Sequence, residues 1–317
     1  MSSYIHNDSD FKNLLAIVSN KLQINIALVE KDYWIMHILY SLQKLGIAFE
    51  LKGGTSLSKG YGVIDRFSED IDIHIKTNFG LAIEGHPDKM AIRNARKEFY
   101  DLLASKLSID GIVSIQRDFD FDDKDKYRSG GIRLNYNGVS EPIEGIKEGV
   151  LLEVGFDQVT PNQAKNISSW VWQYVESKNF QDAYVNNNAI GVLCYHPGYT
   201  LVEKLQTLVR KYRNKQKDST SDAINFMRHY YDVYCLLRND EVLKFIGSEE
   251  YQLHKSKRIK GADAEIPLSE HPAFSLVDPK ERESFKKQYQ LTANLYYKGQ
   301  PDFEVVMAEI DKHKSRF

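Results

Sequence analysis

The chain lacks several features that would place it in common protein classes. It has only two cysteines among 317 residues, Cys194 and Cys235, and their spacing matches no metal-binding motif. We therefore expect free thiols in a reducing compartment. No apolar run reaches the roughly 20 residues of a transmembrane helix, and the N-terminus lacks the basic start and apolar core of a signal peptide. These absences predict a cytoplasmic protein without a membrane anchor.

The chain also lacks an excess of charge of one sign. Its formal net charge is −2, so the overall charge does not predict nucleic-acid binding. The hydrophobic content of 42% is typical of a globular protein with a sizeable core. Basic residues are nevertheless concentrated between Lys204 and Lys217. This stretch could follow an RNA backbone, or it could be a solvated helix face.

The stretch over residues 48–76 has the most informative pattern in the chain. A predicted strand over 48–51 runs into a glycine turn, and hydroxyl residues then begin a short helix. A tight turn of this kind exposes backbone N–H groups, which can bind phosphate oxygens. The turn consists of Gly53, Gly54, Thr55 and Ser56. Many strand–helix connections use these residue types, so the turn alone is a weak signal.

Two aspartates follow on the next predicted strand. Asp70 and Asp72 lie on one face of that strand because side chains alternate with a period of two, while Ile71 and Ile73 face the core. Aspartate is disfavoured in strands, so two of them among isoleucines indicate a functional role. Paired carboxylates can bind a hard divalent cation, Mg²⁺ or Mn²⁺, which often shares its oxygen ligands with substrate phosphates.

A third carboxylate is expected from a later strand. The predicted strand over 149–156 is apolar on both faces, which indicates a central position in the sheet, and it contains Glu153. A buried carboxylate needs a partner. Three carboxylates could hold two metal ions that clamp the attacking and leaving oxygens of an in-line displacement. Asp157 is the alternative third acid, and a site with one metal ion stays open.

The second part of the chain has a different pattern. Helices over 11–22 and 26–45 precede the predicted sheet, but after the break at His196–Pro197–Gly198 the sequence predicts helices almost alone. We therefore predict an α+β protein with two lobes. Residues 1–195 form a lobe with a mixed β-sheet and flanking helices, and residues 196–317 form a helical bundle.

Several blocks of the sequence, taken together, resemble one protein family. The blocks are Glu30–Lys31–Asp32–Tyr33, the run LKGGTSLSKGY from Leu51 to Tyr61, the run RFSEDID from Arg66 to Asp72, Glu203–Lys204–Leu205, and the run RHYYD from Arg228 to Asp232. In this order they resemble the AbiEii/AbiGii toxin family of nucleotidyltransferases, which belongs to the DNA polymerase β-like superfamily. The first lobe would then be the nucleotidyltransferase lobe.

The resemblance implies a role for each matching residue. Asp70 and Asp72 would be the metal ligands, and Glu153 would hold the third acid position and help to bind a second metal ion. These three residues would form the catalytic set, although family members often have Asp at the third position. The remaining residues would bind the nucleotide, and they are Gly53, Gly54, Thr55, Ser56, Ser68, Lys204 and Asp232. From the sequence alone, Lys204 could instead be a solvated charge, and Arg228 and Asp232 could form an exposed i, i+4 pair.

The resemblance also implies an activity and partners. Family members are toxins of bacterial toxin–antitoxin systems linked to abortive infection, and the usual partner is a separate antitoxin with a DNA-binding domain. The expected reaction transfers a nucleotide from a nucleoside triphosphate to an acceptor hydroxyl on RNA, such as the 3′ end of tRNA. Three alternatives remain open: a protein hydroxyl as acceptor, a non-catalytic nucleotide-binding module of this fold, and a sugar-nucleotide glycosyltransferase with an Asp-x-Asp metal pair.

Overall fold

The computed structural model describes residues 2–86, 88–143, 146–217 and 223–317. The chain divides into two compact units. The first unit contains Met1–Gly60 and Ser68–Tyr195, and the second contains Tyr61–Phe67 and His196–Phe317. The sequence assigns residues 61–67 to the first lobe, but in the structure this short segment packs with the C-terminal part of the chain.

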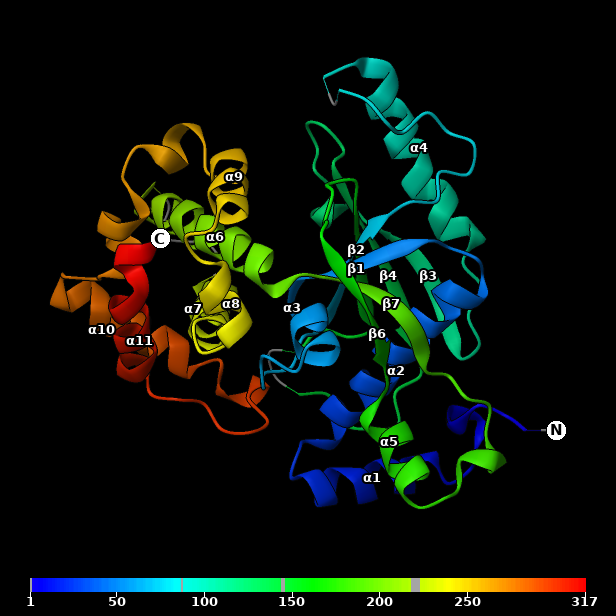
Figure 1. The fold of residues 1–317 in the computed structure, drawn as a ribbon. Coiled ribbons are helices and arrows are strands. Elements are labelled where there is room, and N and C mark those ends of the chain that lie inside the picture. The colour runs from blue at the N-terminus through cyan, green and yellow to red at the C-terminus, as the bar shows by residue number, and fades with distance from the viewer. Residues whose placement is uncertain (1, 87, 144–145, 218–222) are drawn as a thin grey trace. The chain divides into compact units, whose positions relative to one another are not determined.

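The first unit is built around a mixed sheet of seven strands in the described residues, which Figure 1 shows with its labels. The order across the sheet is β3-β4-β5-β2-β1-β7-β6. The pairs β2–β5 and β1–β7 are parallel and the other neighbours are antiparallel. This result confirms the predicted mixed sheet. The strands are β1 Phe49–Lys52, β2 Asp70–Ile75, β3 Ile112–Asp118, β4 Ser129–Tyr136, β5 Val150–Gly155, β6 Asn162–Ile167 and β7 Ala189–Tyr195.

Helices complete the first unit. Helices α1, α2 and α5 pack on one another, α2 also contacts β5 and β7, and α4 contacts β3 and β4. The predicted helix over 11–22 is confirmed, and the one predicted over 26–45 ends at Lys44. The helices are α1 Phe11–Leu22, α2 Ile26–Lys44, α3 Gly53–Thr55, α4 Met90–Lys106 and α5 Trp170–Ser177, and a π-helical turn over Ser56–Gly60 follows α3.

One face of the sheet is apolar and packs against helices. Trp34 of α2 stacks on Tyr136 of β4, with ring centroids 4.8 Å apart. Gly130, on the same face of β4, lies against the Tyr100 ring of α4. The row of residues that crosses the sheet at Gly130 continues through β5 to the buried Ile73 of β2. The sheet therefore buries this face under α2 and α4, and its other face carries the polar residues described below.

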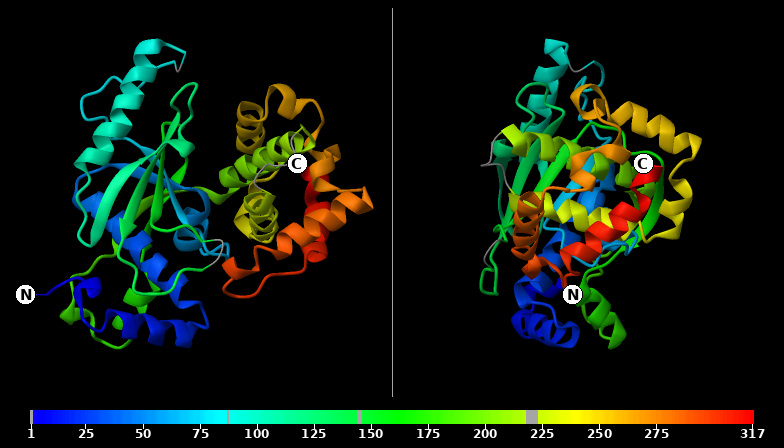
Figure 2. Two further views of the ribbon diagram at one scale, coloured as in Figure 1. Left: turned by 180° about the vertical axis from the view of Figure 1, so that it is seen from behind. Right: turned by 90° about the vertical axis from the view of Figure 1, so that its left-hand side faces the viewer.

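The second unit is helical. Its longest helix, α6, contacts α7, α8 and α9, and α7 also contacts α10 and α11, as the two further views in Figure 2 let the reader follow. No strand follows Tyr195 in the part of the chain that the structure describes, as the sequence predicts. The helices are α6 Pro197–Lys217, α7 Ala223–Leu236, α8 Asp240–Phe245, α9 Glu249–Arg258, α10 Pro279–Gln290 and α11 Phe303–His313.

Candidate active site

The polar face of the sheet carries a row of charged residues on three neighbouring strands. Lys52 of β1 lies opposite Asp72 of β2, and Asp72 lies opposite Glu153 of β5. Asp70 lies on the same face of β2, two residues before Asp72. All four residues are half-buried, while the isoleucines between the aspartates are buried. The structure therefore brings the two aspartates and Glu153 onto one face of adjacent strands.

The pKa of Glu153 is shifted by burial and by these neighbours. Burial and the negative charges of Asp72 and Asp70 raise the pKa of Glu153 to about 7, although Lys52 acts in the opposite direction. At Glu153 the negative charge of the two aspartates therefore outweighs the positive charge of Lys52.

Neighbouring carboxylates that repel one another in this way are oxygen ligands that suit a hard divalent cation. In the described residues no group of three or more His, Cys, Asp or Glu side chains is arranged so that it could hold a metal ion. The residue chemistry fits Mg²⁺ or Mn²⁺, and binding of either ion stays a prediction.

The glycine turn packs closely against β2, the strand that carries the aspartates, and is hydrogen-bonded to it. Gly53 has a φ of +68°, and a Cβ atom at this position would lie 2.1 Å from a carboxylate oxygen of Asp72. Only glycine fits a left-handed conformation in such close contact. The Thr55 hydroxyl donates a hydrogen bond of 2.7 Å to the carbonyl oxygen of Asp70. Gly54, Thr55 and Ser56 are buried. The predicted phosphate turn and the predicted metal pair are thus parts of one local structure.

The second unit holds a separate charged cluster around Asp232 of α7. The Asp232 carboxylate is fully buried and accepts two hydrogen bonds from the Arg66 guanidinium, at 2.6 and 2.7 Å. The Lys204 ammonium lies 2.9 Å from the same carboxylate. Burial alone would raise the pKa of Asp232, but Arg66 and Lys204 outweigh burial and hold that pKa well below its usual range. The alternative of an exposed pair with Arg228 is wrong, because Asp232 is buried.

Lys204 is therefore a positioned residue rather than a solvated charge. Besides Asp232, its ammonium lies 3.3 Å from Nδ1 of His229. Burial and the charge of Lys204 lower the pKa of His229 well below its usual range, so His229 is neutral and accepts a hydrogen bond from Lys204. Asp232 and His229 together fix the Lys204 side chain, which is only slightly exposed.

The basic stretch on α6 is only partly available to a ligand. Arg210 is exposed, but Arg213 forms an ion pair of 2.8 Å with Asp263. The ammonium of Lys215 lies 3.8 Å from the centre of the Phe285 ring. The side chain of Lys217, at the end of the predicted basic stretch, lies outside the described residues. The stretch is therefore neither a fully solvated face nor a continuous free basic surface.

Comparison with known protein families identifies a match over most of the chain. A family model described as nucleotidyl transferase AbiEii toxin, type IV TA system, matches residues 37–309, which is most of the chain. The chain belongs to the AbiEii family. The match confirms the resemblance seen in the sequence motifs, and it makes this protein a nucleotidyltransferase of a toxin–antitoxin family. Searches of curated proteins and of solved structures found no match.

Family membership implies a nucleotide substrate and an antitoxin partner for this AbiEii-family protein. None of the helices in the described ranges is long and apolar enough to span a membrane. Both cysteines are free, as the sequence predicts, with Cys194 buried and Cys235 half-buried. Ser68 is half-buried and lies where the chain returns to the first unit, two residues before Asp70.

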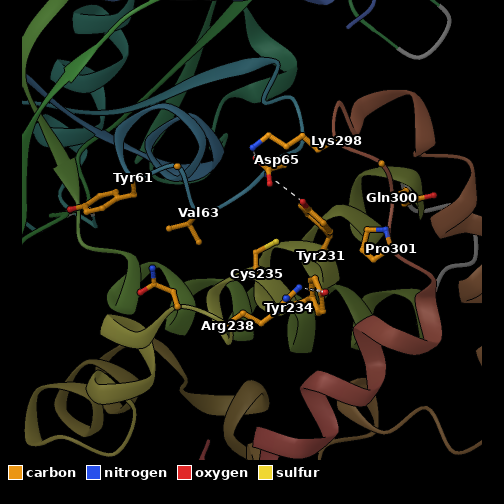
Figure 3. A pocket seen from close by; sticks show the side chains of 13 residues that line it. Tyr61, Val63, Asp65, Tyr231, Tyr234, Cys235, Arg238, Lys298, Gln300 and Pro301 are labelled. Carbon is orange, nitrogen blue, oxygen red and sulfur yellow. Dashed lines mark hydrogen bonds and ion pairs between the residues drawn. The ribbon is translucent and has the colours of Figure 1, made fainter. Parts of the chain in front are cut away.

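The second unit of the AbiEii-family protein also contains a cavity of about 670 Å³, which Figure 3 shows from close by. Tyrosine rings, amides and one guanidinium line it, from the segment over 61–67, from α7 and the turn that follows it, and from the residues before α11. Asp65 links these parts, since its backbone N–H donates to the Tyr231 hydroxyl at 3.2 Å and its carboxylate pairs with Lys298 at 2.8 Å. The lining residues include Tyr61, Tyr231, Tyr234, Arg238, Asn239 and Gln300.

Two residues of the charged clusters, Arg66 and Lys52, have no individual role in the sequence-based prediction. Arg66 belongs to the RFSEDID block, but nothing in the sequence shows that it pairs with Asp232, because the two residues are far apart along the chain. Lys52 follows Glu50 with the period of a strand and directly precedes the glycine turn. Its position at the end of the predicted strand, directly before the glycine turn, could have indicated that Lys52 lies near the aspartates.

Proposed function

We propose that this AbiEii-family protein transfers a nucleotide from a nucleoside triphosphate to an acceptor hydroxyl, in a reaction that depends on Mg²⁺ or Mn²⁺. The observation that carries this proposal is the row of Lys52, Asp72 and Glu153 with Asp70 beside it, next to the glycine turn. When bound, the divalent cation would supply positive charge that stabilises the phosphate during transfer.

The residues of the chain would divide the chemistry between them. Backbone N–H groups of the turn over 53–56 bind triphosphate oxygens. Lys204, held by Asp232 and His229, binds phosphate and stabilises the charge that develops there. Ser68 contributes its hydroxyl to the nucleotide site. These roles follow the family resemblance. The fixed position of Lys204 supports its role in binding phosphate.

Glu153 is suited to accept the proton of the acceptor hydroxyl. A general base works best when its pKa lies near the working pH, and the pKa of Glu153 is raised to about 7. As the hydroxyl proton moves to Glu153, the acceptor oxygen forms a bond to the α-phosphorus. The bond from that phosphorus to the bridging oxygen breaks, and pyrophosphate leaves. Lys52 favours the charged form of Glu153 that this step requires.

We propose RNA, and in particular the 3′ end of tRNA, as the acceptor. The cavity of the second unit supports this choice because proteins hold unpaired bases with aromatic rings, amides and arginine. The exposed Arg210 adds a cation that can contact a phosphate backbone. The separate antitoxin would carry the DNA-binding domain.

The proposal is tested by incubating the protein with each labelled nucleoside triphosphate and total tRNA, with Mg²⁺ or with a chelator. We expect label in the RNA fraction with at least one nucleotide, and none with the chelator. Mass spectrometry of the protein fraction identifies a protein acceptor. Nucleotide binding without turnover in any fraction, with Mg²⁺ and with Mn²⁺, contradicts the proposed enzyme and favours the binding module.

A further inference from the structure

Three consecutive charged residues of α2 are buried in the first unit. Glu30, Lys31 and Asp32 are 1%, 2% and 1% exposed. Charged side chains are almost never buried so completely unless they are paired. Neighbouring residues of a helix point in directions about 100° apart. Each of the three therefore contacts a different segment, and all three segments belong to the region of the candidate active site.

Asp32 holds the end of the glycine-turn segment. Its carboxylate lies 2.5 Å from the Lys59 ammonium and accepts a hydrogen bond of 2.8 Å from the backbone N–H of Trp170. The same ammonium lies 4.2 Å from the centre of the Trp170 ring. Lys59 belongs to the π-helical turn over Ser56–Gly60, which follows α3 directly. The ion pair therefore ties the turn that would bind phosphate to α2.

Lys31 holds the start of the strand that carries the aspartates. Its ammonium lies 3.8 Å from the carboxylate of Glu69 and donates a hydrogen bond of 2.6 Å to the carbonyl oxygen of Lys147. Glu69 also accepts a hydrogen bond of 3.3 Å from the backbone N–H of Lys147. Glu69 directly precedes Asp70. Lys31 therefore fixes the chain at the first residue of β2.

Glu30 holds the connection between β4 and β5. Its carboxylate accepts hydrogen bonds from the backbone N–H groups of Val139 and Ser140, at 2.8 and 2.9 Å, and from the Ser140 hydroxyl. This connection leads from β4 into β5, the strand that carries Glu153. Each of the three charges thus holds one of the segments that position the turn, the aspartates and Glu153.

We propose that Glu30, Lys31 and Asp32 are positioning residues for nucleotidyl transfer, which together align the phosphate turn, the aspartate strand and the strand of Glu153. This inference rests on the proposed function. It states that each charge acts on its own segment, rather than through the stability of the whole unit. Breaking one pair loosens one segment and leaves the other segments in place.

The experiment combines hydrogen exchange with kinetics on the full chain. We expect Asp32→Asn and Lys59→Met each to speed amide exchange about tenfold or more within residues 54–60, but not at the start of β2. For Lys31→Met we expect faster amide exchange over residues 70–72 and unchanged exchange over residues 54–60. Both classes of variant lower kcat/KM about tenfold or more, because reacting groups tolerate little misplacement. Lys59→Arg keeps the positive charge, and we expect it to retain most of the activity that Lys59→Met loses.

Lys12→Met, which removes an exposed lysine of α1, is the matched control and leaves exchange and activity unchanged. The double variant Asp32→Asn/Lys59→Met loses no more activity than the worse single variant, since both remove one pair. Uniform faster exchange throughout the first unit, or local loosening with full activity, overturns the inference. If wild-type protein shows no transfer at all but the local exchange pattern holds, the proposed function fails and the structural coupling stands.

Discussion

Two carboxylate sites of this protein, one in each unit, have opposite surroundings. In the first unit, Asp72 and Glu153 lie opposite each other with Lys52 as the cation beside them, and their repulsion helps to raise the pKa of Glu153 to about 7. In the second unit, Asp232 is paired with both Arg66 and Lys204, and its pKa is held well below its usual range.

This difference separates a site that attracts a cation from a site that is already neutralised. Carboxylates that repel one another gain stability when a divalent cation binds between them. A carboxylate that is surrounded by two cations gains nothing from a third charge, and instead it fixes its cations in place. The comparison therefore predicts that substitutions of the sheet carboxylates change activity, while substitution of Asp232 changes stability.

The largest expected effect belongs to Asp72→Asn, which removes one of the carboxylates of the sheet. We expect nucleotide transfer to fall about 10³-fold or more, because the charge supplied by a metal ion contributes several kcal/mol to catalysis. The free energy of unfolding stays the same or rises, since a repulsive charge is lost. Initial rates with labelled nucleotide and urea unfolding measure the two quantities.

Asp125→Asn is the matched control, because Asp125 is an exposed aspartate in the connection between β3 and β4. It should leave both activity and stability unchanged. Full transfer activity of the Asp72→Asn protein would remove the basis for a metal site on this face of the sheet.

The next effect is expected for Asp232→Asn, which keeps the shape of the side chain and removes its charge. Arg66 is 5% exposed and would lose its buried partner. Removing one member of a buried ion pair typically costs about 3–5 kcal/mol, and we expect the free energy of unfolding to fall by that amount. Urea unfolding at pH 7 is the measurement.

Asp311→Asn provides the comparison, because Asp311 forms an exposed ion pair with Lys314 and such pairs contribute less than about 1 kcal/mol. If Asp232→Asn were as stable as Asp311→Asn, the cluster around Asp232 would not be a structural ion-pair network.

Much of the fold could be predicted from local sequence patterns. Alternation in the stretch DIDIHI, with isoleucine at every second position, marks β2, and apolar runs mark β5. The strand β6 has the sequence NQAKNI and lies at the edge of the sheet, where one side has no neighbouring strand. Its polar sequence lacks the periodic signal, so only pairing with β7 explains why it is a strand.

The candidate site was predictable to the extent that its residues lie close together in the sequence. The glycine turn and the aspartate pair are joined by a short stretch of chain, so their spacing is informative. The pairs Arg66–Asp232 and Asp32–Lys59 depend on how distant segments pack, and no local pattern encodes them. The buried charges of α2 give a weak signal, since three consecutive charges inside an otherwise apolar helix require partners.

A smaller effect is expected for Glu153→Gln, and it depends on pH. The pKa of Glu153 is about 7 in the folded protein and 4.5 as its ordinary value, so the folded state binds the proton more tightly than the unfolded chain. The charged carboxylate therefore destabilises the fold as pH rises from about 4.5, and fully above about 7. We expect Glu153→Gln to raise the free energy of unfolding by roughly 1–3 kcal/mol at pH 8 and to leave it unchanged at pH 4.

Parallel urea unfolding of wild type and Glu153→Gln between pH 4 and pH 8 measures this difference. A constant difference across the range would mean that the substitution acts through packing and that Glu153 has an ordinary pKa.

The smallest expected effect is stabilisation by Mg²⁺ without nucleotide. A ligand that binds only the folded state at ten times its dissociation constant adds about 1.4 kcal/mol to the free energy of unfolding. We expect this gain in wild-type protein, measured by urea unfolding with Mg²⁺ or with a chelator. Asp72→Asn should lose it, because the carboxylate that attracts the ion is gone. Asp232→Asn should keep it, because Asp232 already has two cations. An equal gain in all three proteins would show that Mg²⁺ binds elsewhere. The different surroundings of the two carboxylate sites would then not determine where the metal ion binds.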